Sequence, residues 1–272
     1  MPDPYTWLEP VIRLALSAGE KVMAVYNQHE DAVIDVKQDG SPLTEADRVA
    51  HECIVAGLNE LTPDLPVLSE ESTDIPYSER VEWSRYWLVD PLDGTKEFIA
   101  RTGDFTVNIA LIDEHHTILG VVYAPVLQTC YFACKERGAY KRFSDGTRQA
   151  IHTASWQEAD VLRIISSRRH GIKDLAPFLA QLQRYEMLEM GSSLKFCMVA
   201  EGSADIYPRF GLTSEWDTAA AQCIVEEAGG AIVDHHGLPL QYNTRDSLLN
   251  PYFYAIGNRN LIHHLRNLHV NN

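Results

Sequence analysis

Two carboxylates lie three residues apart on one short turn, at Asp90 and Asp93, directly after the apolar, strand-like run 86–89. Pro91 fixes its own φ, and Gly94 permits a backbone shape that other residues resist, so the geometry of the turn is specified. Both carboxylates can then converge on one point, and all-oxygen ligation is what Mg²⁺ or Mn²⁺ prefers. The turn therefore predicts a divalent-metal site suited to a phosphate group, although the same residue types are common in ordinary surface turns.

Three further segments carry acidic residues where an element begins or ends. Glu70 and Glu71 close another apolar, strand-like run. Asp217 opens an apolar helix, and Asp47 follows Thr44 by three residues, in the arrangement of a capping box. Taken alone, the glutamates fit a solvated strand end and the two aspartates fit helix caps.

Taken together, these segments resemble the inositol monophosphatase superfamily of Mg²⁺-dependent, lithium-sensitive phosphatases, from about residue 10 to residue 260. The resemblance implies the layered αβαβα sandwich of that superfamily. It is carried by Glu70-Glu71, Asp90-Pro91-Leu92-Asp93-Gly94-Thr95 and Trp216-Asp217-Thr218-Ala219-Ala220. Other segments resemble the 3'(2'),5'-bisphosphate nucleotidase branch, which acts in sulfur assimilation: Lys96-Glu97-Phe98, Gly191-Ser192-Ser193-Leu194-Lys195 and Asp205-Ile206-Tyr207-Pro208-Arg209.

The resemblance implies which residues hold metal. Glu70, Asp90 and the Leu92 carbonyl would hold one Mg²⁺, while Asp90, Asp93 and Asp217 would hold a second. Mn²⁺ could replace Mg²⁺, and a third, weakly held ion is common in the family. Two such cations can clamp the attacking and leaving oxygens of an in-line displacement by water.

The resemblance also implies the catalytic residues Asp47, Thr95 and Glu70. Thr95, hydrogen-bonded to Asp47, would orient the attacking water and take its proton. Glu70 would contribute by holding the metal that lowers the pKa of this water.

The expected reaction is hydrolysis of the 3'-phosphate of adenosine 3',5'-bisphosphate to AMP and inorganic phosphate. Backbone N–H groups at the start of a short helix would contact the scissile phosphate. The 5'-phosphate needs its own cation, for which Lys195 and Arg209 are the main candidates. The alternative for Lys195 is an ordinary charge on the exposed surface of a helix. The expected substrate-binding residues are Glu70, Leu92, Asp93, Gly94, Thr95, Asp217, Lys195, Arg209, Ser192 and His170.

The composition limits the partners of the chain. A formal charge of −15 argues against binding to nucleic acid or to an anionic membrane surface, so a small-molecule phosphate is the expected partner. No apolar run is long enough to span a bilayer, and the N-terminus lacks the features of a signal peptide. These features predict a cytoplasmic protein. The resemblance adds a loose association with the inner membrane face, for which the acidic chain offers no physical support. The sequence does not predict an oligomeric state.

The order of the expected elements divides the chain at the polar loop 144–148. An α+β half, residues 1–145, carries most of the metal ligands, and an α/β half, residues 146–272, carries Asp217 and the specificity residues. Together they predict two layers of sheet with helices between and outside them. Strands are expected at 67–68, 86–89, 105–112, 118–124, 129–133, 139–141, 162–166, 185–189, 204–207 and 252–256, and helices at 4–27, 44–58, 175–182, 193–201, 216–228 and from 260.

The sequence leaves three alternatives to the nucleotidase. Haloacid dehalogenase phosphatases carry an Asp-x-Asp-Gly-Thr loop, but the spacing of three here and Pro91 disfavour a covalent aspartyl-phosphate. A non-catalytic module binding a divalent metal could use the same turn, but residues 90–101 lack the calcium-binding EF-hand pattern. The nearest alternative is an inositol-1-phosphate or sugar-phosphate phosphatase of the same superfamily, which a comparison of substrates would distinguish.

Overall fold

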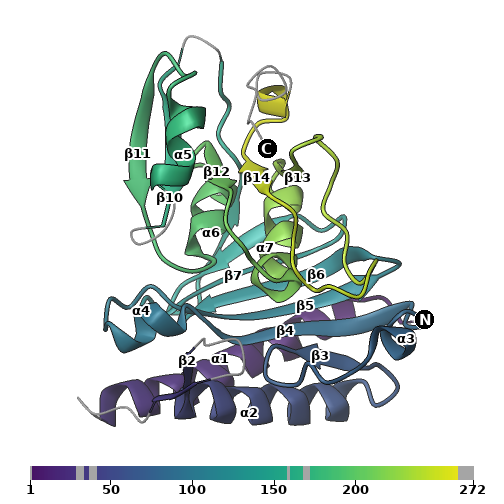
Figure 1. The fold of residues 1–272 in the computed structure, drawn as a ribbon. Coiled ribbons are helices and arrows are strands. Elements are labelled where there is room, and N and C mark those ends of the chain that lie inside the picture. Colours follow the sequence, from purple (N-terminus) through teal and green to yellow (C-terminus); the bar gives the residue numbers. More distant parts are fainter. Residues whose placement is uncertain (1, 29–33, 37–41, 158–159, 168–171, 263–272) are drawn as a thin grey trace.

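The computed structural model describes residues 2–28, 34–36, 42–157, 160–167 and 172–262, which form five layers (Figure 1). Two long helices, α1 (Tyr5–Gln28) and α2 (Glu45–Leu61), cover one face of a seven-stranded sheet. α6 (Leu194–Ala200) and α7 (Glu215–Glu227) lie between this sheet and a five-stranded sheet, whose outer face carries α5 (Ile172–Leu179). The predicted αβαβα sandwich is confirmed.

The larger sheet has the strand order β3-β4-β5-β6-β7-β8-β9, in which only β3 and β4 pair in parallel. The smaller sheet has the order β11-β10-β12-β14-β13. The strands are β1 (Ile34–Val36), β2 (Pro42–Thr44), β3 (Val67–Ser69), β4 (Arg85–Asp93), β5 (Thr106–Asp113), β6 (His116–Ala124), β7 (Thr129–Cys134), β8 (Ala139–Arg142), β9 (Arg148–Ile151), β10 (Leu162–Ser166), β11 (Tyr185–Glu189), β12 (Ile206–Arg209), β13 (Ala231–Asp234) and β14 (Phe253–Ile256), and two short helices are α3 (Tyr77–Arg80) and α4 (Thr95–Ile99).

Strand β4 is buried on both of its faces. Successive side chains of a strand point to opposite faces of the sheet. Trp87 and Val89 accordingly pack with α1 and α2, while Tyr86 and Leu88 pack in the core between the two sheets. Because both faces are packed, the end of this strand, where Asp90 stands, is held firmly in place.

The close approach of α7 to the larger sheet depends on Gly120 in β6. A Cβ atom at this position would collide with the backbone carbonyl of Ala220 in α7. The paired positions on the neighbouring strands are also small, Ala110 in β5 and Ala133 in β7. This seam of small residues lets α7 lie against the sheet that carries Asp90 and Asp93.

The structure departs from the expected elements in several places, and β2 and α3 are among the elements that were not predicted. The polar segment expected as the boundary between the halves is the turn of a hairpin, because Arg148–Ile151 pairs with β8 as the last strand of the larger sheet. The strand Ala231–Asp234 was not predicted. Residues 260–262 are helical as expected, and the continuation of that helix lies outside the described residues. The division into 1–145 and 146–272 stays a prediction. Within the described part of the chain, no helix combines the length and apolarity needed to cross a membrane.

Candidate active site

A bulge at the end of β4 presents Asp90 and Asp93. Pairing with β5 is regular up to Asp90, is interrupted, and resumes at Asp93. Bulges bend a strand and re-aim its side chains. The backbone N–H of Leu92 donates to Oδ1 of Asp90 at 3.0 Å, and Asp90 is only 1% exposed. The bulge therefore allows two carboxylates three residues apart to face the same place.

Asp217 reaches this place from the first turn of α7. The N–H of Ser214, the N-cap residue, donates to Oδ2 of Asp217 at 2.9 Å and fixes the side chain. One carboxylate oxygen from each of Asp90, Asp93 and Asp217 lies within 4.8 Å of the others. Three predicted metal ligands from distant parts of the chain are thus brought together.

Glu70 joins this cluster beside Asp90. It follows β3, and its N–H donates to the carbonyl of Val89 at 3.1 Å, which holds it next to the end of β4. Its carboxyl group acts on Asp90 through charge and through a side-chain hydrogen bond. All four predicted carboxylates are therefore neighbours.

The electrostatics of the cluster favour a cation. Burial raises the pKa of Asp90 and of Asp217 well above the usual value for aspartate, and the neighbouring carboxylates raise both further. Buried like charges repel one another strongly unless a counter-ion or proton compensates them. Because the converging donor atoms are carboxylate oxygens, the site fits a hard divalent cation.

Asp93 is held by a group of donors that the sequence did not reveal. Its Oδ2 accepts hydrogen bonds from the Ser192 hydroxyl at 2.7 Å, the Ser193 N–H at 2.6 Å and the Ser193 hydroxyl at 2.8 Å. All three bonds use the same oxygen, which leaves Oδ1 for a cation. The prediction assigned Ser192 only to substrate and did not assign Ser193, because a contact across about 100 residues has no local signal.

Asp47 and Thr95 lie beside the carboxylate cluster. Oδ2 of the buried Asp47 accepts hydrogen bonds from the N–H and the hydroxyl of Thr44, both at 2.7 Å. The Thr95 hydroxyl lies 3.4 Å from Oδ1 of Asp47 and 3.3 Å from the Leu92 carbonyl oxygen. The cap of α2 and the contact to Thr95 thus use different oxygens of one carboxylate.

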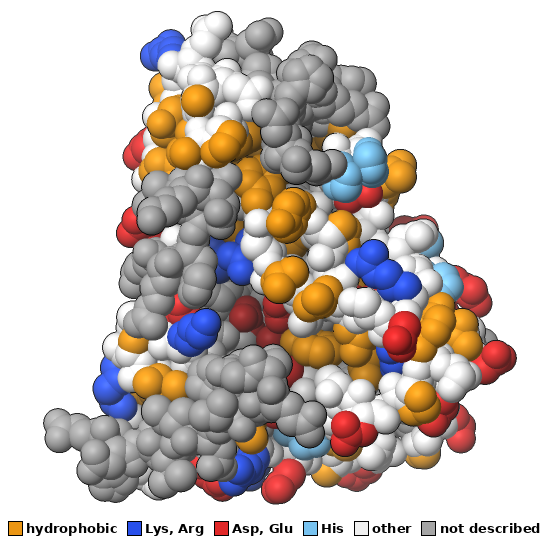
Figure 2. Space-filling model, in the orientation of Figure 1, with side chains coloured by type: hydrophobic (Ala, Val, Ile, Leu, Met, Phe, Trp, Pro, Cys, Tyr) orange, Lys and Arg blue, Asp and Glu red, His pale blue; other side chains and the backbone are white. Residues whose placement is uncertain are grey.

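A cavity of about 130 Å³ opens above the cluster, and Figure 2 shows a hollow near the centre of this face with acidic side chains at its floor and basic ones beside it. Its lining includes Asp93, Gly94 and Asp217 together with predicted substrate residues Ser192, Lys195 and Arg209. Gly94 has a φ of 92°, a conformation that strongly favours glycine, and a Cβ there would crowd Asp104 and Ser192. His170 lies outside the described residues. Three lining residues were not predicted in any role, Ser167, Phe196 and Thr213. Three others, Lys96, Glu97 and Tyr207, were part of the motifs and had no predicted role in the site.

Lys195 is buried rather than exposed on a helix surface, with 6% of its area accessible. Its Nζ donates to the carbonyl oxygen of Ser192 at 2.6 Å and lies 5.2 Å from the centre of the Tyr207 ring. Burial lowers the pKa of Lys195 to about 8, against the opposing attraction of Asp93. The alternative of an ordinary surface charge is therefore excluded for this lysine.

Comparisons with known proteins agree with this geometry. A family model described as the inositol monophosphatase family matches residues 3–269. The chain is 50% identical to the 3'(2'),5'-bisphosphate nucleotidase CysQ of Salmonella typhimurium over 90% of its own length and 98% of that protein. It is 49% identical to the CysQ of Escherichia coli K12 over the same shares. The crystal structure of CysQ from Bacteroides thetaiotaomicron is similar with a TM-score of 0.80 and 41% identity, covering 93% of this chain and 97% of the other.

Proposed function

The chain belongs to the inositol monophosphatase family, and from that premise we propose that it is a magnesium-dependent 3'(2'),5'-bisphosphate nucleotidase. Its reaction converts adenosine 3',5'-bisphosphate to AMP and inorganic phosphate. The observation that carries this proposal is the convergence of the carboxylates of Asp90, Asp93 and Asp217. Two of them, Asp93 and Asp217, line a cavity that also presents Lys195 and Arg209. Relatives about half identical over most of the chain carry the name of this activity.

The carboxylates provide the metal-binding part of the site. Glu70, Asp90 and the Leu92 carbonyl would hold one cation, and Asp90, Asp93 and Asp217 the second. When bound, two such cations supply charge stabilisation for the phosphoryl group and a more acidic water. Mg²⁺ is favoured over Zn²⁺ because every donor is oxygen, and Mn²⁺ shares this preference.

Asp47 and Thr95 handle the proton of the attacking water. The Thr95 hydroxyl can accept a hydrogen bond from water while donating to Asp47 or to the Leu92 carbonyl oxygen, which lie 3.4 and 3.3 Å away. Because Oδ2 of Asp47 is engaged by Thr44, Oδ1 is the oxygen directed toward the reaction. Asp47 then serves as the final acceptor of the proton.

The cationic side of the cavity would bind the second phosphate. Lys195 carries a buried ammonium group and Arg209 a guanidinium group suited to phosphate. A second cavity, of about 360 Å³, shares Lys96, Ser167, Tyr207 and Arg209 with the first. It adds the apolar side chains of Leu175, Phe210 and Leu212, which offer room for a nucleoside next to its phosphates. This apolar extension favours a nucleotide over inositol-1-phosphate or a sugar phosphate.

The test is phosphate release from purified protein with adenosine 3',5'-bisphosphate, AMP and inositol-1-phosphate. Each substrate is measured with Mg²⁺, with Ca²⁺ and with a chelator, and Asp93→Asn serves as the matched inactive control. We expect Mg²⁺-dependent turnover of the bisphosphate to exceed that of both monophosphates. Faster turnover of inositol-1-phosphate would overturn the substrate assignment. Tight Ca²⁺ binding without hydrolysis of any substrate would identify a non-catalytic module.

The remaining expectations stay proposals. We propose a cytoplasmic location. No described feature of the chain supports an association with the inner membrane face. Titration of the purified protein with Mn²⁺ measures the number of cations bound at rest, including a third.

A further inference from the structure

Arg80 is a buried cation that has no part in the reaction proposed above. It ends α3, in the segment that leads into β4, and is 2% exposed. Its Nη1 donates to Oδ1 of Asn243 at 2.7 Å, its Nη2 to the carbonyl oxygen of Asp246 at 2.9 Å, and its Nε to the carbonyl oxygen of Ile75 at 3.1 Å. The guanidinium group therefore joins segments that are more than 160 residues apart in the chain.

Asn243 continues this connection toward α7. It is fully buried and has a φ of 55°, a left-handed conformation that asparagine tolerates better than most residues. Its side-chain amide donates to the carbonyl oxygen of Arg80, so the two residues bond in both directions. Its backbone N–H donates to both carboxylate oxygens of Glu215, at 3.0 and 2.9 Å.

Glu215 is the first residue of α7 and stands two positions before Asp217. It is 2% exposed, and its own N–H donates to the carbonyl oxygen of Leu248 at 2.8 Å. A carboxylate buried in this way is costly unless hydrogen bonds and a nearby positive charge compensate it. Asn243 provides the hydrogen bonds, and Arg80 attracts the charge.

We propose that Arg80, Asn243 and Glu215 form a positioning network that holds the start of α7 against the segment leading into β4. The network sets the position of Asp217 relative to Asp90 and Asp93. The carboxylates of Asp90, Asp93 and Asp217 repel one another in the metal-free protein, and the network holds the start of α7 against this repulsion. Rigid placement of the ligands before binding reduces the cost of binding a cation.

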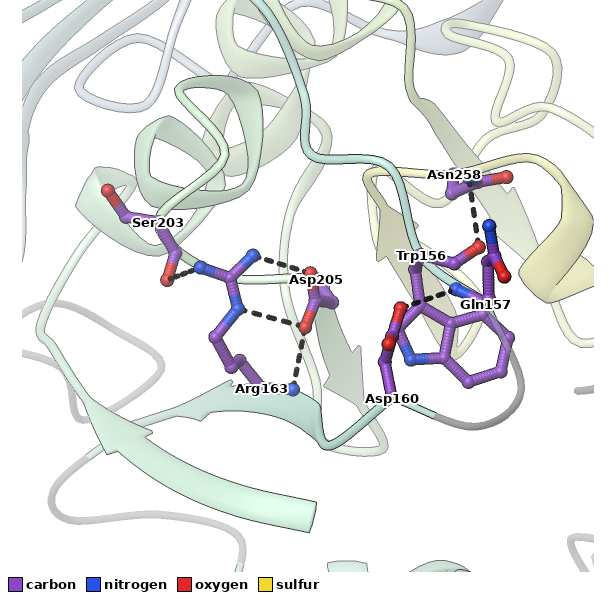
Figure 3. Close-up of polar contacts among 7 residues, drawn as sticks. All are labelled: Trp156, Gln157, Asp160, Arg163, Ser203, Asp205 and Asn258. Carbon is purple, nitrogen blue, oxygen red and sulfur yellow. Dashed lines mark hydrogen bonds and ion pairs between the residues drawn. The ribbon is translucent and has the colours of Figure 1, made fainter. Parts of the chain in front are cut away.

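A second arginine, which is less buried than Arg80, provides a control. Arg163 in β10 donates from Nη2 and Nε to Asp205 at 2.6 and 3.0 Å, and from Nη1 to the carbonyl oxygen of Ser203 at 3.2 Å. Figure 3 shows this pair as a compact set of contacts beside strands β10 and β12. It resembles the Arg80 network in its number of hydrogen bonds, but it carries none of the proposed metal ligands.

The experiment compares Arg80→Met with Arg163→Met by Mn²⁺ binding, measured from the electron paramagnetic resonance of free Mn²⁺, and by urea unfolding in chelator. Both substitutions should lower the free energy of unfolding. Only Arg80→Met should weaken Mn²⁺ binding, by about tenfold or more, as expected when the support of a metal ligand is lost. Equal Mn²⁺ affinity in the two folded variants would overturn the proposal.

Asn243→Gly provides a second test if Arg80→Met does not fold. Glycine accepts the left-handed backbone and keeps the N–H that binds Glu215, so only the link to Arg80 is removed. We expect several-fold weaker Mn²⁺ binding, and unchanged affinity in this variant would also overturn the proposal. The inference rests on Asp217 as a metal ligand. Absence of Mn²⁺ binding to the wild-type protein would refute that assignment, whereas wild-type affinity in the variants would refute the network alone.

Discussion

The first turns of α2 and α7 have the same local structure and different chemical surroundings. In each, an aspartate three residues after a Thr or Ser N-cap accepts the N-cap N–H through Oδ2, at 2.7 Å for Asp47 and 2.9 Å for Asp217. At the start of α2, Asp47 has the hydroxyl of Thr95 as its neighbour outside the helix. At the start of α7, Asp217 has the carboxylates of Asp90 and Asp93 as its neighbours outside the helix.

In the proposed scheme, one carboxylate both caps a helix and takes part in catalysis or metal binding. A cap fixes one carboxylate oxygen and the rotamer of the side chain, so the other oxygen points in a defined direction. Its surroundings then decide its role. Next to a hydroxyl, Asp47 is suited to receive a proton, and among carboxylates, Asp217 is suited to share a cation.

The largest effect is expected for Asp217→Asn. The amide oxygen can still accept the Ser214 N–H, so the cap is kept while the negative charge is lost. We expect kcat/KM to fall by about 10³-fold, the upper range for removal of one electrostatic group, together with a large loss of Mn²⁺ affinity. The metal-free variant should be more stable than wild type in urea, because one of several repelling charges is gone. A less stable metal-free variant would show that Asp217 acts mainly as a cap.

A smaller and different effect is expected for Asp47→Asn. The cap of α2 should again be preserved, but the proton acceptor is lost, so kcat at saturating Mg²⁺ should fall by about 10²-fold. Mn²⁺ affinity should stay within a factor of about three, since Asp47 holds no cation in the proposed scheme. Loss of metal affinity as large as that in Asp217→Asn would contradict the division of roles between the two helices.

Contacts of the site could be predicted from the sequence when the interacting residues lie close together along the chain, and not when they lie far apart. The turn at Asp90 and the two caps are local patterns, so both their structure and their place in the site could be anticipated. The bonds from Ser193 to Asp93 and from Arg80 to Asn243 join residues 100 and 163 positions apart, and no local pattern indicates them. Strand Ala231–Asp234 is four residues long and follows Gly229 and Gly230, so its neighbourhood indicated a turn.

The smallest effect concerns the pH dependence of stability. The pKa values of Asp90 and Asp217 are raised in the folded, metal-free protein by burial and by neighbouring carboxylates. The folded state therefore binds more protons than the unfolded state above pH 4 or so, and the stability of the metal-free protein should fall as pH rises toward the raised pKa values. Because a cation binds the deprotonated groups, the rise in Tm on adding Mg²⁺ should grow over the same range. Thermal unfolding from pH 4.5 to 8, with Mg²⁺ and with chelator, measures both slopes, and Asp217→Asn should flatten them. Parallel curves with and without Mg²⁺ would contradict the assignment.

Anomalous diffraction from crystals soaked in Mn²⁺ is the most direct test of the central claim, that carboxylates from separate segments hold a pair of cations. We predict two anomalous peaks about 3.5–4 Å apart, with Asp90 contacting both, Glu70 on one side and Asp217 on the other. Absence of a peak among these side chains, or a cation held by β4 alone while Glu70 and Asp217 bind none, would contradict the account.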